Sequence, residues 1–185
     1  MVDKRKDGNT ADKDEARTPG VLFRKLDERY HLLIDAAATS ENSLCPYYLE
    51  DSLNVGWAEA IEEVEIHHEQ PAAIWCNAPY SHPNIERFVT KAAYETQNGA
   101  TVVMLLPADT GTRTFRHYIM GRNDDGTKNN HGASEVIFLY PRVTFNNPDG
   151  TSMKGTARNA SMIVVFEGED KEPKFSVMRW NDVDE

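Results

Sequence analysis

The segment with the clearest chemical potential is Asn77-Ala78-Pro79-Tyr80, which directly follows the apolar run 72–76 (AAIWC). The exocyclic amine of a nucleic-acid base is a poor nucleophile, because its lone pair is delocalised into the ring. An enzyme that alkylates this amine must accept both of its hydrogens and restore electron density on the nitrogen. The Asn77 side-chain oxygen and the Ala78 carbonyl can supply these two acceptors, while the Tyr80 ring can stack on an extruded base.

The same four residues also suit a plain turn after a strand, because Asn, Pro and Tyr are all frequent there. Two other strand ends carry small or polar residues. Asp35 ends one apolar run and precedes three alanines, and Pro107-Ala108-Asp109-Thr110 follows the apolar run 101–106. In open α/β sheets, ligands bind beyond the carboxyl ends of the strands. We therefore expect the three polar loops to converge on one edge of a sheet.

Hydrophobic patterning predicts an α/β fold that positions these loops. Helices are predicted at 20–30, 58–69, 83–97 and 113–120, and strands at 31–35, 47–49, 72–76, 101–106, 135–140, 143–145, 161–166 and 175–180. Helices and strands alternate first, and strands then follow one another. This order predicts a mostly parallel sheet with an antiparallel edge. The Glu-rich helix 58–69 has a poor apolar stripe, which is typical of a solvated surface helix or an ordered insertion.

Length and charge restrict the class of protein. The chain has 185 residues, of which 39% are hydrophobic, and we expect a single domain at 18–180 between charged tails at 1–17 and 181–185. A formal net charge of −10 argues against a protein held to nucleic acid by bulk electrostatics alone. Over residues 91–158, however, eight basic residues outnumber six acidic ones. A modest basic rim there is compatible with DNA as a substrate.

The remaining features concern the compartment and metals. No apolar run reaches the roughly 20 residues that a membrane span requires, and we expect neither a membrane segment nor a signal peptide. Cys45 and Cys76 form no C-x-x-C pair, which favours a reduced, cytoplasmic protein. His67-His68-Glu69 lacks further ligands at a suitable spacing, so no metal is expected.

Five motifs follow one another along the chain. They are Thr18-Pro19-Gly20-Val21-Leu22-Phe23, Ile34-Asp35-Ala36-Ala37-Ala38-Thr39 with Glu41-Asn42, Asp51-Ser52-Leu53 followed by Trp57, Trp75-Cys76-Asn77-Ala78-Pro79-Tyr80-Ser81, and residues 102–110 (VVMLLPADT). In type and order they resemble the motifs of the phage-type DNA N6-adenine methyltransferases of the Dam family. The resemblance extends over about residues 18–166.

The resemblance implies a Rossmann-like methyltransferase fold that uses S-adenosylmethionine to methylate an adenine flipped out of double-stranded DNA, in a protein encoded by a phage or prophage. The implied catalytic residues are Asn77, Ala78, Pro79 and Tyr80. The implied donor-binding residues are Thr18, Pro19, Asp35, Ala36 and Ala37, with Asp51 at the donor's adenine or ribose. The expected DNA-contacting residues are Tyr80, Arg113, Arg142 and Phe145, and the segments 121–134 and 146–160 are expected to recognise the site.

Two departures from the family pattern leave alternatives open. Ala78 replaces the usual proline, which costs about 0.4–1 kcal/mol of chain entropy but keeps the acceptor carbonyl, so we expect reduced or retained activity. The segment 156–162 lacks the family's Pro-Phe. Transfer to the exocyclic amine of cytosine follows the same chemistry and is one alternative. A catalytically weakened DNA- or partner-binding protein on the same fold is the other.

Overall fold

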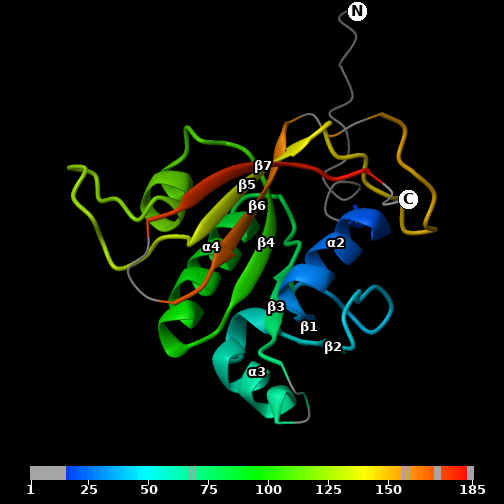
Figure 1. Cartoon of the computed structure of the whole chain (residues 1–185), viewed down its shortest axis with the longest axis horizontal. Coiled ribbons are helices and arrows are strands. Elements are labelled where there is room, and N and C mark those ends of the chain that lie inside the picture. The colour runs from blue at the N-terminus through cyan, green and yellow to red at the C-terminus, as the bar shows by residue number, and fades with distance from the viewer. Residues whose placement is uncertain are drawn as a thin grey trace, which may run out of the picture.

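The computed structural model describes residues 16–66, 68, 70–155, 157, 159–168 and 172–182. In this part of the chain a seven-stranded sheet forms the centre, and helices cover both of its faces (Figure 1). The predicted tails at 1–17 and 181–185 lie outside the described residues, apart from 16–17 and 181–182. None of the described helices is long and apolar enough to cross a membrane.

The strands are β1 (Leu32–Asp35), β2 (Tyr47–Tyr48), β3 (Ala73–Cys76), β4 (Val102–Pro107), β5 (Glu135–Tyr140), β6 (Ser161–Phe166) and β7 (Lys174–Arg179). The α-helices are α2 (Gly20–Tyr30), α3 (Trp57–Glu65) and α4 (Asn84–Glu95). Short helical segments are η1 (Ser52–Asn54), η2 (Thr96–Asn98) and η3 (Phe115–Ile119), the last of which is a π-helix.

The sheet has the order β2-β1-β3-β4-β6-β5-β7. Strands β2, β1, β3 and β4 are parallel neighbours, β6 runs antiparallel to both β4 and β5, and β7 is parallel to β5. A mostly parallel sheet with an antiparallel part is therefore confirmed. The antiparallel strand β6 lies inside the sheet, whereas the sequence predicted an antiparallel edge.

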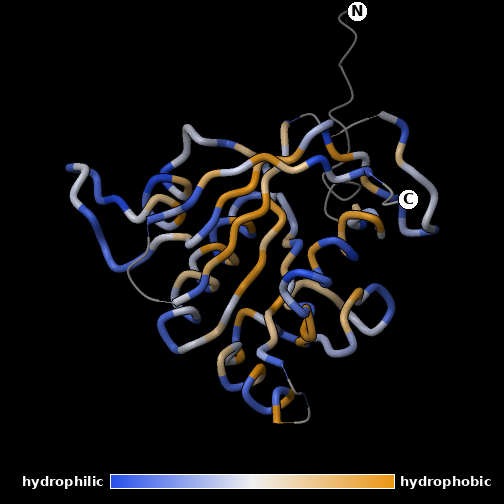
Figure 2. The backbone as a smooth tube through the Cα atoms, in the orientation of Figure 1, coloured by the Kyte–Doolittle hydropathy of each residue, from blue (hydrophilic) through white to orange (hydrophobic). Residues whose placement is uncertain are grey.

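Alternating side chains of the central strands build two hydrophobic layers. Ile74 and Cys76 belong to the layer that includes buried residues of α3, α4 and η3. Ala73 and Trp75 belong to the opposite layer, with buried residues of α2. Because both faces are covered, the central strands are apolar throughout, as their hydropathy colouring shows (Figure 2).

The prediction of a strand at 143–145 is wrong. Val143 and Phe145 are both buried, which explains the misleading alternation. Their carbonyls accept hydrogen bonds from the Ala157 and Met153 N–H groups rather than from a sheet strand. The partner of β5 on its outer side is instead β7.

Two helix predictions need correction. The helix predicted at 58–69 ends at Glu65, and its face with Trp57, Ala58 and Ile61 is buried, so α3 is not a fully solvated helix. His67 and Glu69 lie outside the described residues. The helix predicted at 113–120 is present mainly as the π-helix η3.

The buried carboxylate of Glu95 in α4 accepts a hydrogen bond from the start of α3. Glu95 is 6% exposed, accepts a hydrogen bond from the Ala58 N–H at 3.0 Å and forms an ion pair with Lys91 Nζ at 2.5 Å. Lys91 Nζ also lies 5.9 Å from the centre of the Trp57 ring. The carboxylate therefore satisfies a helix N-terminus that has no side-chain cap of its own.

We expect Lys91→Met to lower the free energy of unfolding by about 3 kcal/mol, because it leaves Glu95 as a buried carboxylate without its counter-ion. The double variant Lys91→Met/Glu95→Gln removes both charges and should recover most of this loss. Urea denaturation followed by circular dichroism measures both values. Equal destabilisation of the two variants would contradict this account of the pair.

Candidate active site

Three loops meet at one edge of the sheet, as the sequence predicts. Strands β1, β3 and β4 are adjacent and parallel, with Asp35 opposite Trp75 and Cys76 opposite Met104. Their carboxyl ends therefore lie side by side. The loops that begin after Asp35, Cys76 and Pro107 leave the sheet from this edge.

A small inner cavity of about 60 Å³ lies between the first two loops and the segment before α2. Its lining residues are Ala16, Arg17, Thr18, Asp35, Ala37, Ala38, Asn42, Leu44, Trp75 and Asn77. Ligand pockets usually enclose about 300–1,000 Å³, so this cavity suits only the end of a larger molecule. Of the six expected donor-binding residues, the structure brings Thr18, Asp35 and Ala37 to its wall.

Two charged residues, Arg17 and Asp35, line the inner cavity. Asp35 is 5% exposed, and its carboxylate accepts hydrogen bonds from the Ala37 N–H at 3.1 Å and the Leu44 N–H at 3.3 Å. Burial raises the pKa of this carboxyl to about 6, and the two hydrogen bonds offset only part of that effect. In the described part of the chain, Asp35 forms no ion pair with a basic side chain.

The inner cavity also holds an unsatisfied hydroxyl. Thr18 is 4% exposed, and its Oγ1 has no hydrogen-bond partner among the described residues. A buried carboxylate without a counter-ion and a buried hydroxyl without a partner together suit a ligand that carries an ammonium group and further polar atoms. The amino-acid end of S-adenosylmethionine has this chemistry, so the residues present fit it.

The other three expected donor-binding residues lie elsewhere. Pro19 and Ala36 are buried beside the cavity-lining residues Thr18 and Ala37 but do not line the cavity themselves. Asp51 is exposed before η1, and its carboxylate accepts a hydrogen bond from Asn54 Nδ2 at 2.8 Å. The structure does not bring Asp51 to the wall of the inner cavity.

The loop from Asn77 to Tyr80 connects the inner cavity to a larger one. Asn77 lines the inner cavity, and its Nδ2 donates to the Ala16 carbonyl at 3.4 Å. Tyr80 donates through its hydroxyl to the Leu105 carbonyl at 3.3 Å and lines the larger cavity. Burial raises the pKa of the Tyr80 phenol. Neighbouring residues of one loop thus face two separate cavities.

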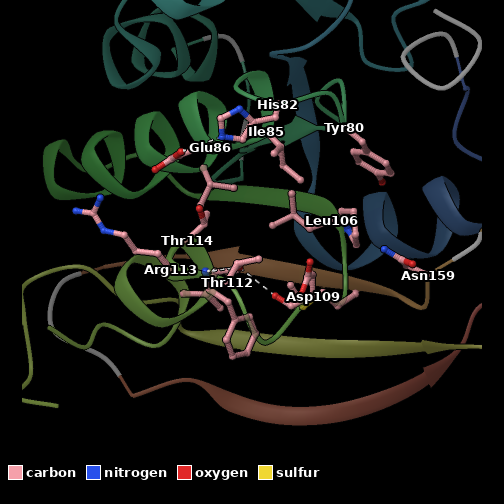
Figure 3. A pocket seen from close by; sticks show the side chains of 15 residues that line it. Tyr80, His82, Ile85, Glu86, Leu106, Asp109, Thr112, Arg113, Thr114 and Asn159 are labelled. Atoms are coloured by element: carbon pink, nitrogen blue, oxygen red, sulfur yellow. Dashed lines mark hydrogen bonds and ion pairs between the residues drawn. The ribbon is translucent and has the colours of Figure 1, made fainter. Parts of the chain in front are cut away.

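The larger cavity has a volume of about 580 Å³ (Figure 3). Tyr80 and the expected DNA contact Arg113 both line it. Polar lining residues that the sequence did not single out individually are His82, Glu86, Thr112, Thr114 and Asn159. Thr112 and Thr114 lie soon after the polar end of β4, and Asn159 lies in the segment 146–160. Only the tertiary structure brings His82 and Glu86 to this wall.

Two expected DNA contacts are placed differently. Phe145 is 7% exposed, and its ring meets the Tyr80 ring edge to face, with 6.1 Å between the ring centres. It therefore supports Tyr80 from within the protein. Arg142 is exposed just beyond the end of β5 and lines neither the inner nor the larger cavity.

Several basic side chains of the predicted rim are already paired with acidic side chains. Three of its members form ion pairs with acidic side chains: Lys91 with Glu95, Arg116 with Asp124, and Arg122 with Glu172. Arg158 lies outside the described residues. Within the part of the chain that is described, no group of three or more His, Cys, Asp or Glu side chains could hold a metal ion.

The two segments expected to recognise the site lie at different ends of the sheet. The segment 121–134 leads into the start of β5, and Arg122 pairs with Glu172 just before β7. The segment 146–160 instead joins the active-site edge, because Asn146 pairs with Arg17 and Asn159 lines the larger cavity. The structure therefore brings the described part of 146–160, and not 121–134, to the Asn77 loop.

A mostly parallel sheet with one antiparallel strand and polar loops at the carboxyl ends of β1, β3 and β4 is the architecture of Rossmann-like methyltransferases. Within this class, the chain belongs to the DNA N-6-adenine-methyltransferase (Dam) family, whose model matches residues 6–185. The resemblance noted in the sequence is thereby confirmed.

A relative from Escherichia phage T1, described as a DNA N-6-adenine-methyltransferase, is 29% identical over 158 residues. The aligned region covers 82% of this chain and 56% of that protein, so the chain spans little more than half the length of this relative. No solved structure matches the chain significantly.

We expect Asp35→Asn to stabilise the folded protein at neutral and alkaline pH. The folded-state pKa of about 6 lies above the ordinary value of 3.8, so the carboxyl favours folding when protonated and this contribution disappears as the pH rises through about 6. Removing the charge should raise the free energy of unfolding by up to about 3 kcal/mol at pH 8 and by little at pH 4.

Urea denaturation across this pH range measures the effect of Asp35→Asn. Asp51→Asn is a matched control, because it makes the same substitution at an exposed carboxylate. A pH-independent difference between Asp35→Asn and the parent would contradict a desolvated Asp35.

Proposed function

We propose that this chain is a DNA adenine-N6 methyltransferase that uses S-adenosylmethionine. The observation that carries the proposal is the loop Asn77-Ala78-Pro79-Tyr80, which connects a small cavity holding a buried carboxylate to a cavity of about 580 Å³. In this proposal, the methyl donor would occupy the inner cavity and the extruded base the larger cavity, so that the two would meet at this loop. Membership of the Dam family and the name of the phage T1 relative support adenine as the base.

Asp35 and Thr18 would hold the amino-acid end of the donor. The Asp35 carboxylate balances the charge of an ammonium group, and the unsatisfied Thr18 hydroxyl supplies a further hydrogen bond. When bound, S-adenosylmethionine supplies an activated methyl group. The donor extends beyond the inner cavity of about 60 Å³, so part of it would lie outside that cavity.

Asn77 and Ala78 would prepare the adenine amine for attack. The Asn77 side-chain oxygen and the Ala78 carbonyl accept its two hydrogens, which localises the nitrogen lone pair in the direction of the methyl group. Tyr80 would provide an aromatic face for the flipped base, and Pro79 restricts the backbone between these groups. The larger cavity falls within the usual volume range of ligand pockets.

The alanine at position 78 is compatible with this role. Ala78 is 3% exposed and packs in the hydrophobic layer formed with α3 and α4. Burial raises the pKa of the Cys76 thiol. A hydrogen bond from the Ala78 N–H, a group that proline lacks, partly offsets this rise in pKa. The substitution therefore keeps the carbonyl and adds a local contact.

The proposal extends to the organisation and setting of the protein. Residues 18–180 would form one methyltransferase domain, with residues 146–160 and Arg113 contacting double-stranded DNA. A DNA substrate implies action in the cytoplasm of a host cell, and the phage T1 relative supports a phage or prophage origin.

Expression in a bacterial host that lacks adenine methylation tests the reaction. We expect mass spectrometry of digested DNA to detect N6-methyladenine, and sequencing of the modified DNA to locate it in one short site. N4-methylcytosine alone would show that cytosine is the target. Absence of both products, together with no donor binding by calorimetry, would favour a binding protein instead.

We expect Asn77→Ala to lower kcat by about 10²–10³-fold, because it removes one acceptor that stabilises the transition state. Donor affinity, measured by titration calorimetry, should change far less than kcat. Asn123→Ala is a suitable control, since Asn123 lies in the 121–134 segment at the other end of the sheet. An Asn77→Ala enzyme as active as the parent would exclude the proposed role of this side chain.

A further inference from the structure

We propose that the backbone pair between Arg17 and Asn146 is a positioning element that holds both ends of the Asn77–Tyr80 loop. The inference rests on the proposed function, because it assigns a role to segments around the proposed catalytic loop. Arg17 N–H donates to the Asn146 carbonyl, and Asn146 N–H donates to the Arg17 carbonyl, each at 2.9 Å. This antiparallel bridge joins residues that lie far apart in the sequence.

The first end of the loop is held through the residue before Arg17. The Ala16 carbonyl accepts a hydrogen bond from Asn77 Nδ2 at 3.4 Å. Among the described residues, the Asn77 side-chain oxygen accepts no hydrogen bond. With its nitrogen bound to Ala16, the Asn77 amide is oriented so that this oxygen remains available to the adenine amine. The bridge fixes Ala16 because it fixes the next residue.

The second end of the loop is held through the residue before Asn146. The buried Phe145 ring meets the Tyr80 ring edge to face, with their centres 6.1 Å apart. The Phe145 carbonyl accepts a hydrogen bond from the Met153 N–H at 2.8 Å. Phe145 and Asn146 are adjacent, so a shift at the bridge moves the support of Tyr80 as well as that of Asn77.

A hairpin with side-chain hydrogen bonds in its turn anchors Asn146 on its other side. Asn146 forms a second antiparallel bridge with Ser152, and the turn between them has the sequence Asn147-Pro148-Asp149-Gly150-Thr151. Asn147 Nδ2 donates to Thr151 Oγ1 at 2.9 Å, and the Asp149 carboxylate accepts from the Thr151 N–H and hydroxyl at 2.9 and 2.6 Å. These contacts hold residue 146 in a defined position.

The chain contains a second hairpin of the same design, which provides an internal control. Its turn is Asn123-Asp124-Asp125-Gly126-Thr127, between bridge partners Arg122 and Lys128. Asn123 Nδ2, Thr127 and the Asp125 carboxylate repeat the same three hydrogen bonds, at 3.1, 2.9 and 2.6 Å. Figure 1 shows this yellow-green loop and the orange loop that follows Asn146 at opposite sides of the molecule. Only the hairpin between Asn146 and Ser152 is joined to the active-site edge.

The test compares Asn146→Pro with Arg122→Pro. Each removes the N–H at the same position of an equivalent hairpin. Asn146→Pro removes a bond to the segment that contacts Asn77, whereas Arg122→Pro removes a bond to the Arg116 carbonyl in η3. At saturating donor and DNA, we expect Asn146→Pro to lower kcat by about 10-fold or more, with the DNA KM changing far less. Arg122→Pro should lower thermal stability and lower kcat much less than Asn146→Pro does. Equal losses of kcat in the two variants would overturn the proposal.

A second measurement does not depend on activity. In NMR spectra, the Asn77 side-chain amide is identified by its absence in Asn77→Ala. We expect its protons to exchange slowly with solvent in the parent and several times faster in Asn146→Pro. The same exchange rate in both would overturn the positioning role. If the parent transfers no methyl group, the proposed function is wrong, whereas the exchange comparison still decides whether the bridge orients Asn77.

A reversible cross-link covers the case in which Asn146→Pro fails to fold. In Arg17→Cys/Asn146→Cys, a disulfide formed by mild oxidation would lock the bridge, while the native Cys45 and Cys76 are buried and protected. A positioning element stays in place during turnover, so the oxidised and reduced forms of this variant should have the same kcat. An oxidised form that is inactive until reduced would show that the segment must separate, and would overturn the proposal.

Discussion

Parallel pairing of β1, β3 and β4 is the constraint on which the site depends. Parallel neighbours end at the same edge, and the backbone that leaves this edge must satisfy its polar groups in loops. Residues 35, 77 and 107 therefore lie close together although about forty and thirty residues separate them in sequence. Because helices cover both faces of the sheet, the edge is where a ligand can reach these strands.

The buried Asp35 carboxylate lowers the stability of the folded protein at neutral pH. It lies at the end of an apolar strand, and two backbone hydrogen bonds only partly compensate for lost hydration. A cationic ligand would supply the missing counter-charge. The same residue that weakens the isolated protein at neutral pH would thus provide affinity for a donor with an ammonium group, which is a common arrangement in binding sites.

The two Asn-x-Asp-Gly-Thr hairpins separate local structure from function. Their turn hydrogen bonds are the same, since five residues of this sequence determine them. One hairpin adjoins Arg17 and Phe145 at the active-site edge, and the other follows η3 and precedes β5. What each hairpin does is decided by the residues beside it. A local motif alone cannot provide that information.

The sequence by itself determined most strands, the helices around the apolar faces and the order of the family motifs, because hydrophobic period and local turn chemistry are written in neighbouring residues. It also indicated that Asp35, Asn77 and Pro107 share an edge. Only the tertiary structure decided that β6 lies inside the sheet, that β7 rather than 143–145 pairs with β5, and that Arg17 meets Asn146. These contacts are backbone hydrogen bonds between distant segments, and because every residue except proline can form them, they leave no side-chain signature in the sequence.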